Sequence, residues 1–186
     1  MKIAFIIFNN MTALDFIGFF DPVARLKTMG FMKDLDWDIC SFEDKVKDDK
    51  GLSFIPDKIH SPLDIYDIIF VPGGFGTRAL INNIDFISWL KTSDNVKLKV
   101  SVCTGSLLLG KAGLLKDKRA TTHPNKLNEL RKYCKEAVKS RIVDEQSLIT
   151  AGGVTSSIDL GLYLVKNIAG EVVKNKIAAQ MDYPYG

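Results

Sequence analysis

The chain has 186 residues, of which 46% are hydrophobic and 25% charged, and its formal net charge at pH 7 is +3. This length and composition predict one globular domain over 1–186, and the small, evenly spread charge excludes a basic surface for nucleic acid. The first apolar run is too short for a secretory leader and no segment is long enough for a membrane span, so we expect a cytoplasmic protein.

The first half of the chain alternates between strand patterns and one long helical pattern. Residues 2–8 are apolar almost throughout, which is typical of a strand buried on both faces of a parallel sheet. A helix is expected over 13–29, with Thr12 as N-cap and a kink or restart at Pro22. We predict further strands over 36–42, 52–55 and 66–71, a solvated turn or hairpin tip over 43–50, and a polar connection over 56–62.

The second half continues this alternation. A glycine-rich turn over 73–76 follows the strand that ends at residue 71, and a strand over 96–102 leads directly to Cys103. Small residues and leucines after Cys103 favour a helix. We predict further helices over 84–90, 124–134, 156–168 and 171–181, a short strand over 119–122, and a hairpin-like pair over 141–143 and 147–150.

This order of elements predicts an α/β fold with a doubly wound, mostly parallel sheet flanked by helices. In such sheets the functional site lies at the carboxyl ends of the strands. The turns after residues 8, 71 and 102 should meet at that edge, so the candidate residues are sought in and beside these turns.

Cys103 stands at an abrupt turn between a strand and a helix, which resembles a nucleophile elbow. Unpaired backbone N–H groups at a helix start favour a thiolate, so we expect the thiol pKa to lie below the free value of about 8.5. The alternative is a cysteine that only packs, which is how we interpret Cys40 and Cys134. Three widely spaced cysteines without a CxxC pair indicate neither a disulfide framework nor a metal site.

The glycine-rich turn offers backbone N–H groups to the same edge. Gly73 and Gly74 could direct amides into the cleft and hold an oxyanion. A phosphate loop is a second interpretation, but neither GxGxxG nor the Walker lysine pattern is present. An ordinary strand-to-helix turn is the third.

Two titratable residues complete the candidate set. Asp15 stands among large apolar residues, so burial would raise its pKa and let it exchange a proton near neutral pH. The alternative is a solvated aspartate in the first turn of a helix. His123 precedes Pro124 at an expected helix start, and a structural and a chemical role both remain open.

Five segments, in this order along the chain, resemble the ThiJ/PfpI superfamily. They are residues 12–18 (TALDFIG), 71–76 (VPGGFG), 101–106 (SVCTGS), 120–123 (ATTH) and 149–156 (ITAGGVTS). The branch that the chain resembles is that of isonitrile hydratase, which is also similar to the regulatory domain of some AraC-type transcription factors. The resemblance implies a flavodoxin-like, class I glutamine amidotransferase-like fold and a homodimer.

The resemblance also assigns roles to residues. It implies that Cys103 is the nucleophile with Thr104 beside it, and that Asp15 is the acidic partner of the thiol. It further implies oxyanion or substrate-binding roles for Gly73, Gly74 and His123.

The function implied by this branch is hydration of an isonitrile, a small-molecule substrate, to an N-substituted formamide. Such chemistry needs a nucleophile and a proton donor, with no cofactor and no metal. A glyoxalase or deglycase acting on reactive aldehydes is the alternative enzyme. A redox or small-molecule sensor is the alternative outside catalysis, and no DNA-binding domain is expected because no helix-turn-helix pattern follows the core.

Overall fold

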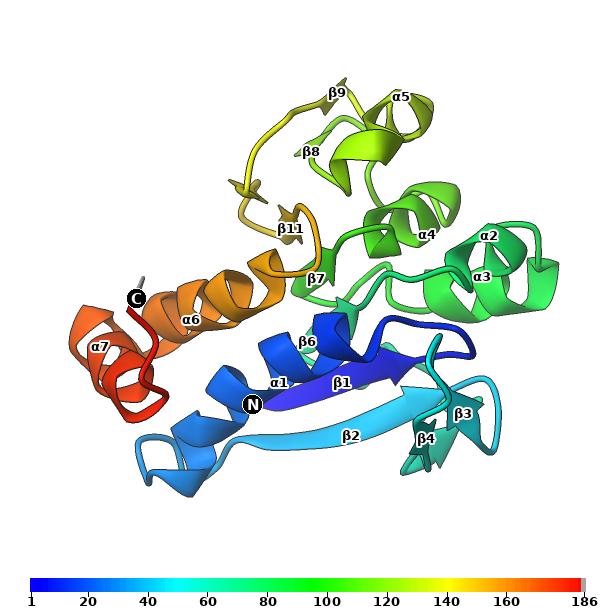
Figure 1. Cartoon of the computed structure of the whole chain (residues 1–186). Coiled ribbons are helices and arrows are strands. Elements are labelled where there is room, and N and C mark those ends of the chain that lie inside the picture. Colours follow the sequence, from blue (N-terminus) through cyan, green and yellow to red (C-terminus); the bar gives the residue numbers. More distant parts are fainter. Residues whose placement is uncertain (185–186) are drawn as a thin grey trace.

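The structure is a computed structural model that describes residues 1–184. Its centre is a seven-stranded sheet (Figure 1). In spatial order the strands are β10 (Ile142–Asp144), β11 (Leu148–Ala151), β7 (Leu98–Val102), β6 (Ile68–Val71), β1 (Lys2–Ile7), β2 (Asp36–Ser41) and β5 (Lys58–Ile59). All neighbours are parallel except β10 and β11, which form an antiparallel hairpin. The doubly wound, mostly parallel sheet is confirmed.

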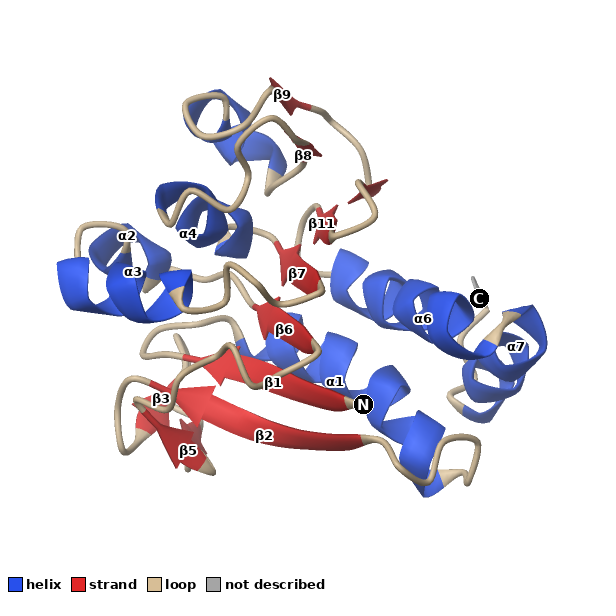
Figure 2. Cartoon of the chain, turned by 180° about the vertical axis from the view of Figure 1, so that it is seen from behind, coloured by secondary structure: helices blue, strands red, loops and turns tan. Residues whose placement is uncertain are grey.

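Helices lie on both sides of this sheet. They are α1 (Ala13–Thr28), α2 (Thr77–Leu80), α3 (Ile84–Lys91), α4 (Gly105–Lys111), α5 (Leu127–Leu130), α6 (Ser156–Ala169) and α7 (Glu171–Gln180), with a 3-10 turn at Pro124–Lys126. Helix α6 packs against α1 and α7, whereas α4 packs against α2 and α3. Figure 2 shows these two groups of helices apart from each other, with β6 and β7 between them. Within residues 1–184, no helix is both long enough and apolar enough to cross a membrane.

Of the kink or restart predicted at Pro22, the restart is wrong. Helix α1 runs without interruption from Ala13 to Thr28, and Pro22 is buried within it. A Cβ atom on Gly161 of α6 would lie 2.4 Å from Pro22 Cγ, so the proline ring packs closely against that helix. This contact offsets the backbone hydrogen bond that proline cannot donate.

The segment 43–50 belongs to a hairpin, which is one of its two predicted forms, and not to a solvated turn, which is the other. It contains β3 (Val46–Lys47), which pairs with β4 (Ser53–Phe54) in a small antiparallel sheet. Val46 is buried, and so is Asp48, whose Oδ1 accepts the backbone N–H of Leu52 at 2.7 Å. A charged side chain that binds backbone amides closes this loop, and charge patterning alone does not reveal that.

Other differences concern short elements. Strand β5 lies in the predicted connection over 56–62, and β8 (Arg119–Ala120) pairs with β9 (Glu136–Ala137) outside the central sheet. The helix expected over 124–134 is only the 3-10 turn followed by α5. Strands β5 and β9 have two residues each, which is too few to show an alternating pattern in the sequence.

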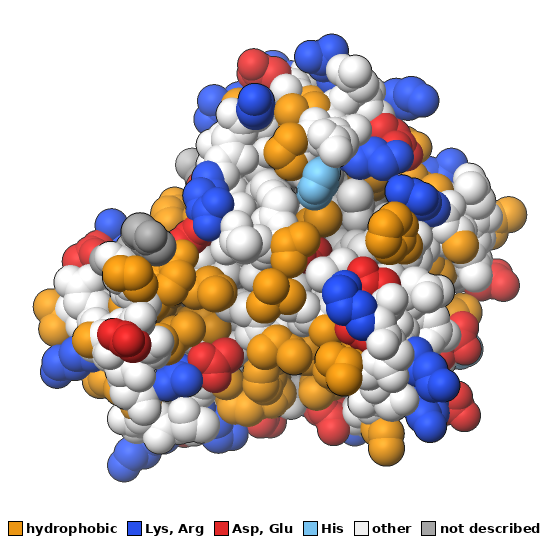
Figure 3. Space-filling view, viewed as in Figure 1, with side chains coloured by type: hydrophobic (Ala, Val, Ile, Leu, Met, Phe, Trp, Pro, Cys, Tyr) orange, Lys and Arg blue, Asp and Glu red, His pale blue; other side chains and the backbone are white. Residues whose placement is uncertain are grey.

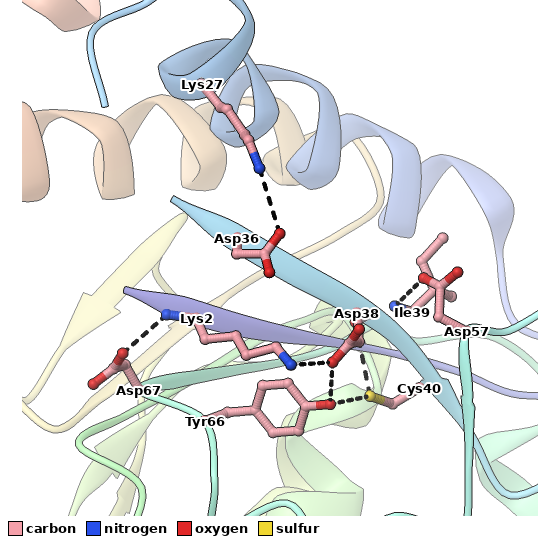
Figure 4. A network of polar contacts seen from close by, with 9 residues as sticks. All are labelled: Lys2, Lys27, Asp36, Asp38, Ile39, Cys40, Asp57, Tyr66 and Asp67. Atoms are coloured by element: carbon pink, nitrogen blue, oxygen red, sulfur yellow. Dashed lines mark hydrogen bonds and ion pairs between the residues drawn. The ribbon is translucent and has the colours of Figure 1, made fainter. Parts of the chain in front are cut away.

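Figure 4 shows a polar network that joins β1, β2 and the segment before β6. Lys2 Nζ lies 2.7 Å from Asp38 Oδ2, and the Tyr66 hydroxyl donates to the same oxygen at 2.7 Å. The Cys40 thiol lies 3.4 Å from that hydroxyl. Burial raises the pKa of the Cys40 thiol to about 11. Cys40 is therefore an unreactive thiol inside the core, as expected of a packing residue.

Candidate active site

The loops after β1 and β6 are joined directly at the carboxyl edge of the sheet. Met11 and Gly74 form a β-bridge, and the Thr12 N–H donates to the Gly73 carbonyl at 2.9 Å. Gly74 has a φ of 132°, and a Cβ atom there would lie 2.6 Å from the Asn10 carbonyl oxygen. Only glycine allows this approach, which brings the start of α1 beside the glycine-rich turn.

Cys103 occupies a strained backbone position between β7 and α4. Its φ of 54° lies in the left-handed region, which is uncommon for a residue with a side chain. The Cys103 N–H donates to the Gly152 carbonyl at 2.7 Å, and its own carbonyl accepts the Thr122 hydroxyl at 2.8 Å. These bonds hold the backbone in the conformation of a nucleophile elbow.

Gly105 makes the elbow sterically possible. A Cβ atom at this position would lie 2.3 Å from the Val71 carbonyl oxygen and 2.7 Å from that of Pro72. The start of α4 therefore packs directly on the end of β6, and any larger residue would push the elbow away from the glycine-rich turn.

Asp15 is fully buried at the start of α1, with Phe16 and Phe19 also buried around it. Its Oδ2 accepts the Gly73 N–H at 2.9 Å, whereas Oδ1 makes no regular hydrogen bond in the described part of the chain. The Cys103 thiol is close enough that the two groups shift each other's pKa. In the described part of the chain the two side chains form a close electrostatic pair with no regular hydrogen bond between them.

Both members of the pair have raised pKa values. Burial raises the pKa of Asp15 to about 7, although the Gly73 amide and the thiol act in the opposite direction. Burial, and after it the Asp15 carboxylate, raises the pKa of the Cys103 thiol to about 12, against the Thr104 amide and hydroxyl. The prediction of a lowered thiol pKa is therefore wrong, because desolvation and a neighbouring acid outweigh the helix start. The raised pKa expected for Asp15 is confirmed.

Two predicted oxyanion amides already have partners. The Gly73 N–H donates to Asp15, and the Gly74 N–H donates to the Thr104 hydroxyl oxygen at 3.1 Å. The Thr77 hydroxyl donates to the Gly74 carbonyl at 2.8 Å and fixes the turn. In this arrangement the glycine amides position Asp15 and Thr104, and an oxyanion role for them stays a prediction.

Cys103 and His123 line one pocket of about 510 Å³. Figure 3 shows apolar and basic side chains gathered with one histidine around a hollow near α2, α4 and α5. The remaining lining residues are Thr12, Leu14, Asp49, Lys50, Gly74, Phe75, Thr77, Arg78, Ile81, Thr104, Leu107, Asn125, Lys126, Glu129 and Val154. The pocket thus combines the Cys103 thiol with an amphipathic wall.

The site includes residues that the sequence interpretation missed. Asp49 accepts the Thr12 hydroxyl at 3.2 Å and Lys50 lines the pocket, although both belong to the segment predicted as a solvated turn or hairpin tip. Thr122 holds the elbow carbonyl. Within residues 1–184 no group of three or more His, Cys, Asp and Glu side chains is arranged to hold a metal ion.

Comparison with known proteins identifies the family. The chain matches the DJ-1/PfpI family over residues 1–167. It is 32% identical to isonitrile hydratase from Pseudomonas putida, over 98% of this chain and 78% of that protein. It is 29% identical to the HTH-type transcriptional regulator CdhR from Pseudomonas aeruginosa, over 88% of this chain and 50% of the regulator. A solved ThiJ/PfpI family protein from Pseudomonas syringae superimposes with a TM-score of 0.89 at 28% identity, covering 98% of this chain and 75% of that chain. The fold, the elbow at Cys103 and these matches together show that the chain belongs to the DJ-1/PfpI family.

Proposed function

We propose that this protein hydrates an isonitrile to the N-substituted formamide, with Cys103 as nucleophile and Asp15 as the proton carrier. The observation that carries the proposal is the buried Asp15 carboxyl beside the thiol, with a pKa near 7 that suits proton exchange. The 32% identity to the Pseudomonas putida hydratase supports the choice of substrate.

The reaction balances with these two groups and water. As Cys103 Sγ adds to the terminal carbon of R–N≡C, Asp15 takes the thiol proton and delivers it to that carbon. The product is a thioimidate, R–N=CH–S–Cys103. Water then adds to the same carbon, a proton moves to the nitrogen, and the carbon–sulfur bond breaks. The formamide R–NH–CHO leaves and the thiol is restored, with no electron donor or acceptor consumed.

A panel assay tests this proposal against the alternative substrates. Purified protein is incubated with cyclohexyl isocyanide, methylglyoxal and a small amide, and product formation is followed by NMR. Formation of N-cyclohexylformamide supports the proposal. Turnover of methylglyoxal alone supports the aldehyde reaction, and peroxide-driven loss of the Cys103 thiol without any turnover supports a sensor.

The coupled pair predicts how activity depends on pH. Below pH 7 the Asp15 carboxyl is protonated, so no base is present to take the thiol proton. Between about pH 7 and about pH 12, Asp15 and Cys103 together hold a single proton. We therefore expect kcat/KM for the isonitrile to rise with pH around a midpoint near 7 and to stay level through pH 9. A rate that falls between pH 5 and pH 8 would contradict this active form.

We further propose that the protein is a homodimer, as the family resemblance implies. Leu14 and Ile17 on α1 are large hydrophobic side chains that remain 49% and 43% exposed, and one face of the molecule carries a broad apolar area there (Figure 3). Light scattering at micromolar concentration should give about twice the chain mass of 20.7 kDa. A stable monomer would refute the dimer.

A further inference from the structure

The pocket contains a cation that has no acidic partner. Lys50, Arg78 and Lys126 all line it, together with two carboxylates. Lys50 Nζ lies 2.5 Å from Asp49, and Lys126 Nζ lies 2.7 Å from Glu129. In the part of the chain that the structure describes, the Arg78 side chain makes neither an ion pair nor a hydrogen bond.

Arg78 is held in place by an aromatic ring instead. Its guanidinium carbon lies 4.7 Å from the centre of the Phe75 ring, and Phe75 is itself 61% exposed at the pocket. A cation over an aromatic face is attracted to the ring, and a guanidinium in this position still presents its N–H groups at its edges. Those N–H groups match the two oxygens of a carboxylate.

A second hydrogen-bond donor, His123, lies on the pocket wall. His123 Nδ1 accepts the Asn125 N–H at 3.3 Å, so the neutral ring carries its proton on Nε2. The wall between the polar groups is apolar, with Leu14, Ile81, Leu107 and Val154. Among the residues that the structure describes, the pocket therefore combines the Cys103 thiol and apolar side chains with one cation that has no counterion.

We propose that Arg78 binds the carboxylate of the substrate, and that the substrate is an aliphatic molecule with its reacting carbon at one end and a carboxylate at the other. The identity of the reacting group as an isonitrile rests on the proposed function, whereas the carboxylate subsite rests on Arg78 and the pocket alone. Arg78 is then a specificity-determining residue, because it contacts the part of the substrate that does not react.

Binding is measured without turnover. Hexanoate and hexanamide have the same length and differ in charge. Each is added at increasing concentration while iodoacetamide alkylates Cys103, and the fall in the alkylation rate reports binding. The alkylation is measured on the Cys103 peptide by mass spectrometry. We expect hexanoate to bind about tenfold more tightly than hexanamide, the effect of one partly exposed charge-assisted contact. Arg78→Gln should abolish this preference. Arg131→Gln is the matched control, because Arg131 is an exposed arginine outside the pocket lining.

Turnover provides the second readout. Hexyl isocyanide and 6-isocyanohexanoate are compared, and Arg78→Gln should raise KM for the acid about tenfold while leaving kcat for the acid, and KM for the neutral compound, unchanged. If neither isonitrile reacts, the proposed function is wrong. The binding experiment still shows whether Arg78 binds a carboxylate. Equal binding of hexanoate and hexanamide by the natural protein, or a preference that survives Arg78→Gln, overturns the subsite.

Discussion

Replacing Cys103 with alanine should reduce isonitrile hydration to the uncatalysed rate, a loss of at least about a thousandfold. The thiol lines the pocket and is the only sulfur among the lining residues of the described chain. Without it no covalent intermediate forms, and Asp15 alone supplies no bond to the isonitrile carbon. The assay is the initial rate of N-cyclohexylformamide formation.

Stability provides the first control for Cys103→Ala. Alanine carries a Cβ atom as cysteine does, so the left-handed φ of 54° costs about the same in both proteins. The melting temperature should therefore change little. Cys134→Ala is the matched cysteine control, because Cys134 is half-buried on another part of the fold and should keep full activity. Substantial activity in a folded Cys103→Ala protein would exclude a covalent mechanism through this residue.

Asp15→Asn should lower turnover by at least about a hundredfold, the lower range for a general acid or base. Asparagine has the shape of aspartate and its side-chain carbonyl can still accept the Gly73 N–H, which Asp15 Oδ2 accepts at 2.9 Å. It cannot take the thiol proton or deliver one to the isonitrile carbon. In the Asp15→Asn protein, the rise of kcat/KM around pH 7 should be absent. Normal turnover by the variant would reduce Asp15 to a packing residue.

The same substitution should not destabilise the fold above pH 7. The pKa of Asp15 rises from 3.8 to about 7 on folding, so the folded state binds the proton more tightly than the unfolded state. The free energy of unfolding therefore falls as pH rises from about 4 to about 7, because the buried carboxyl must ionise. Asparagine removes this cost. We expect thermal unfolding at pH 8 to show Asp15→Asn melting at or above the natural protein, and a lower melting temperature would point to a structural role for the carboxylate.

Much of the fold follows from sequence because its long strands and helices have clear apolar patterns. The buried run over 2–8, the strand before the glycine-rich turn and the helix over 156–168 all correspond to observed elements. For 43–50 the hairpin is observed but the solvated surface is not, for a different reason. Val46 and Asp48 are buried, and the backbone of Lys47 and Asp49 bonds to the loop after β1, so a charged sequence of this kind resembles solvated surface until its neighbours in space are known.

Cys103 and Asp15 could be predicted from sequence as site residues, but the pKa of the Cys103 thiol could not. Cys103 and Asp15 could be placed at one edge of the sheet from topology alone, because β1 and β7 flank β6 and end on the same side. The thiol pKa could not be predicted, since the helix start is visible in sequence but the burial of Cys103 and its contact with the acid are not. The same holds for Arg78, because its missing counterion is a property of its neighbours in space.

The most direct test of the thiol–carboxyl pair is to observe the covalent intermediate. The protein is mixed with less than one equivalent of cyclohexyl isocyanide, quenched with acid at successive times and digested for mass spectrometry. We expect the Cys103 peptide to gain and then lose the mass of one whole isonitrile molecule as the formamide appears, and Asp15→Asn to show neither adduct nor product on this timescale. Formamide that appears at the same rate while Cys103 stays fully alkylatable at every time point would contradict the account.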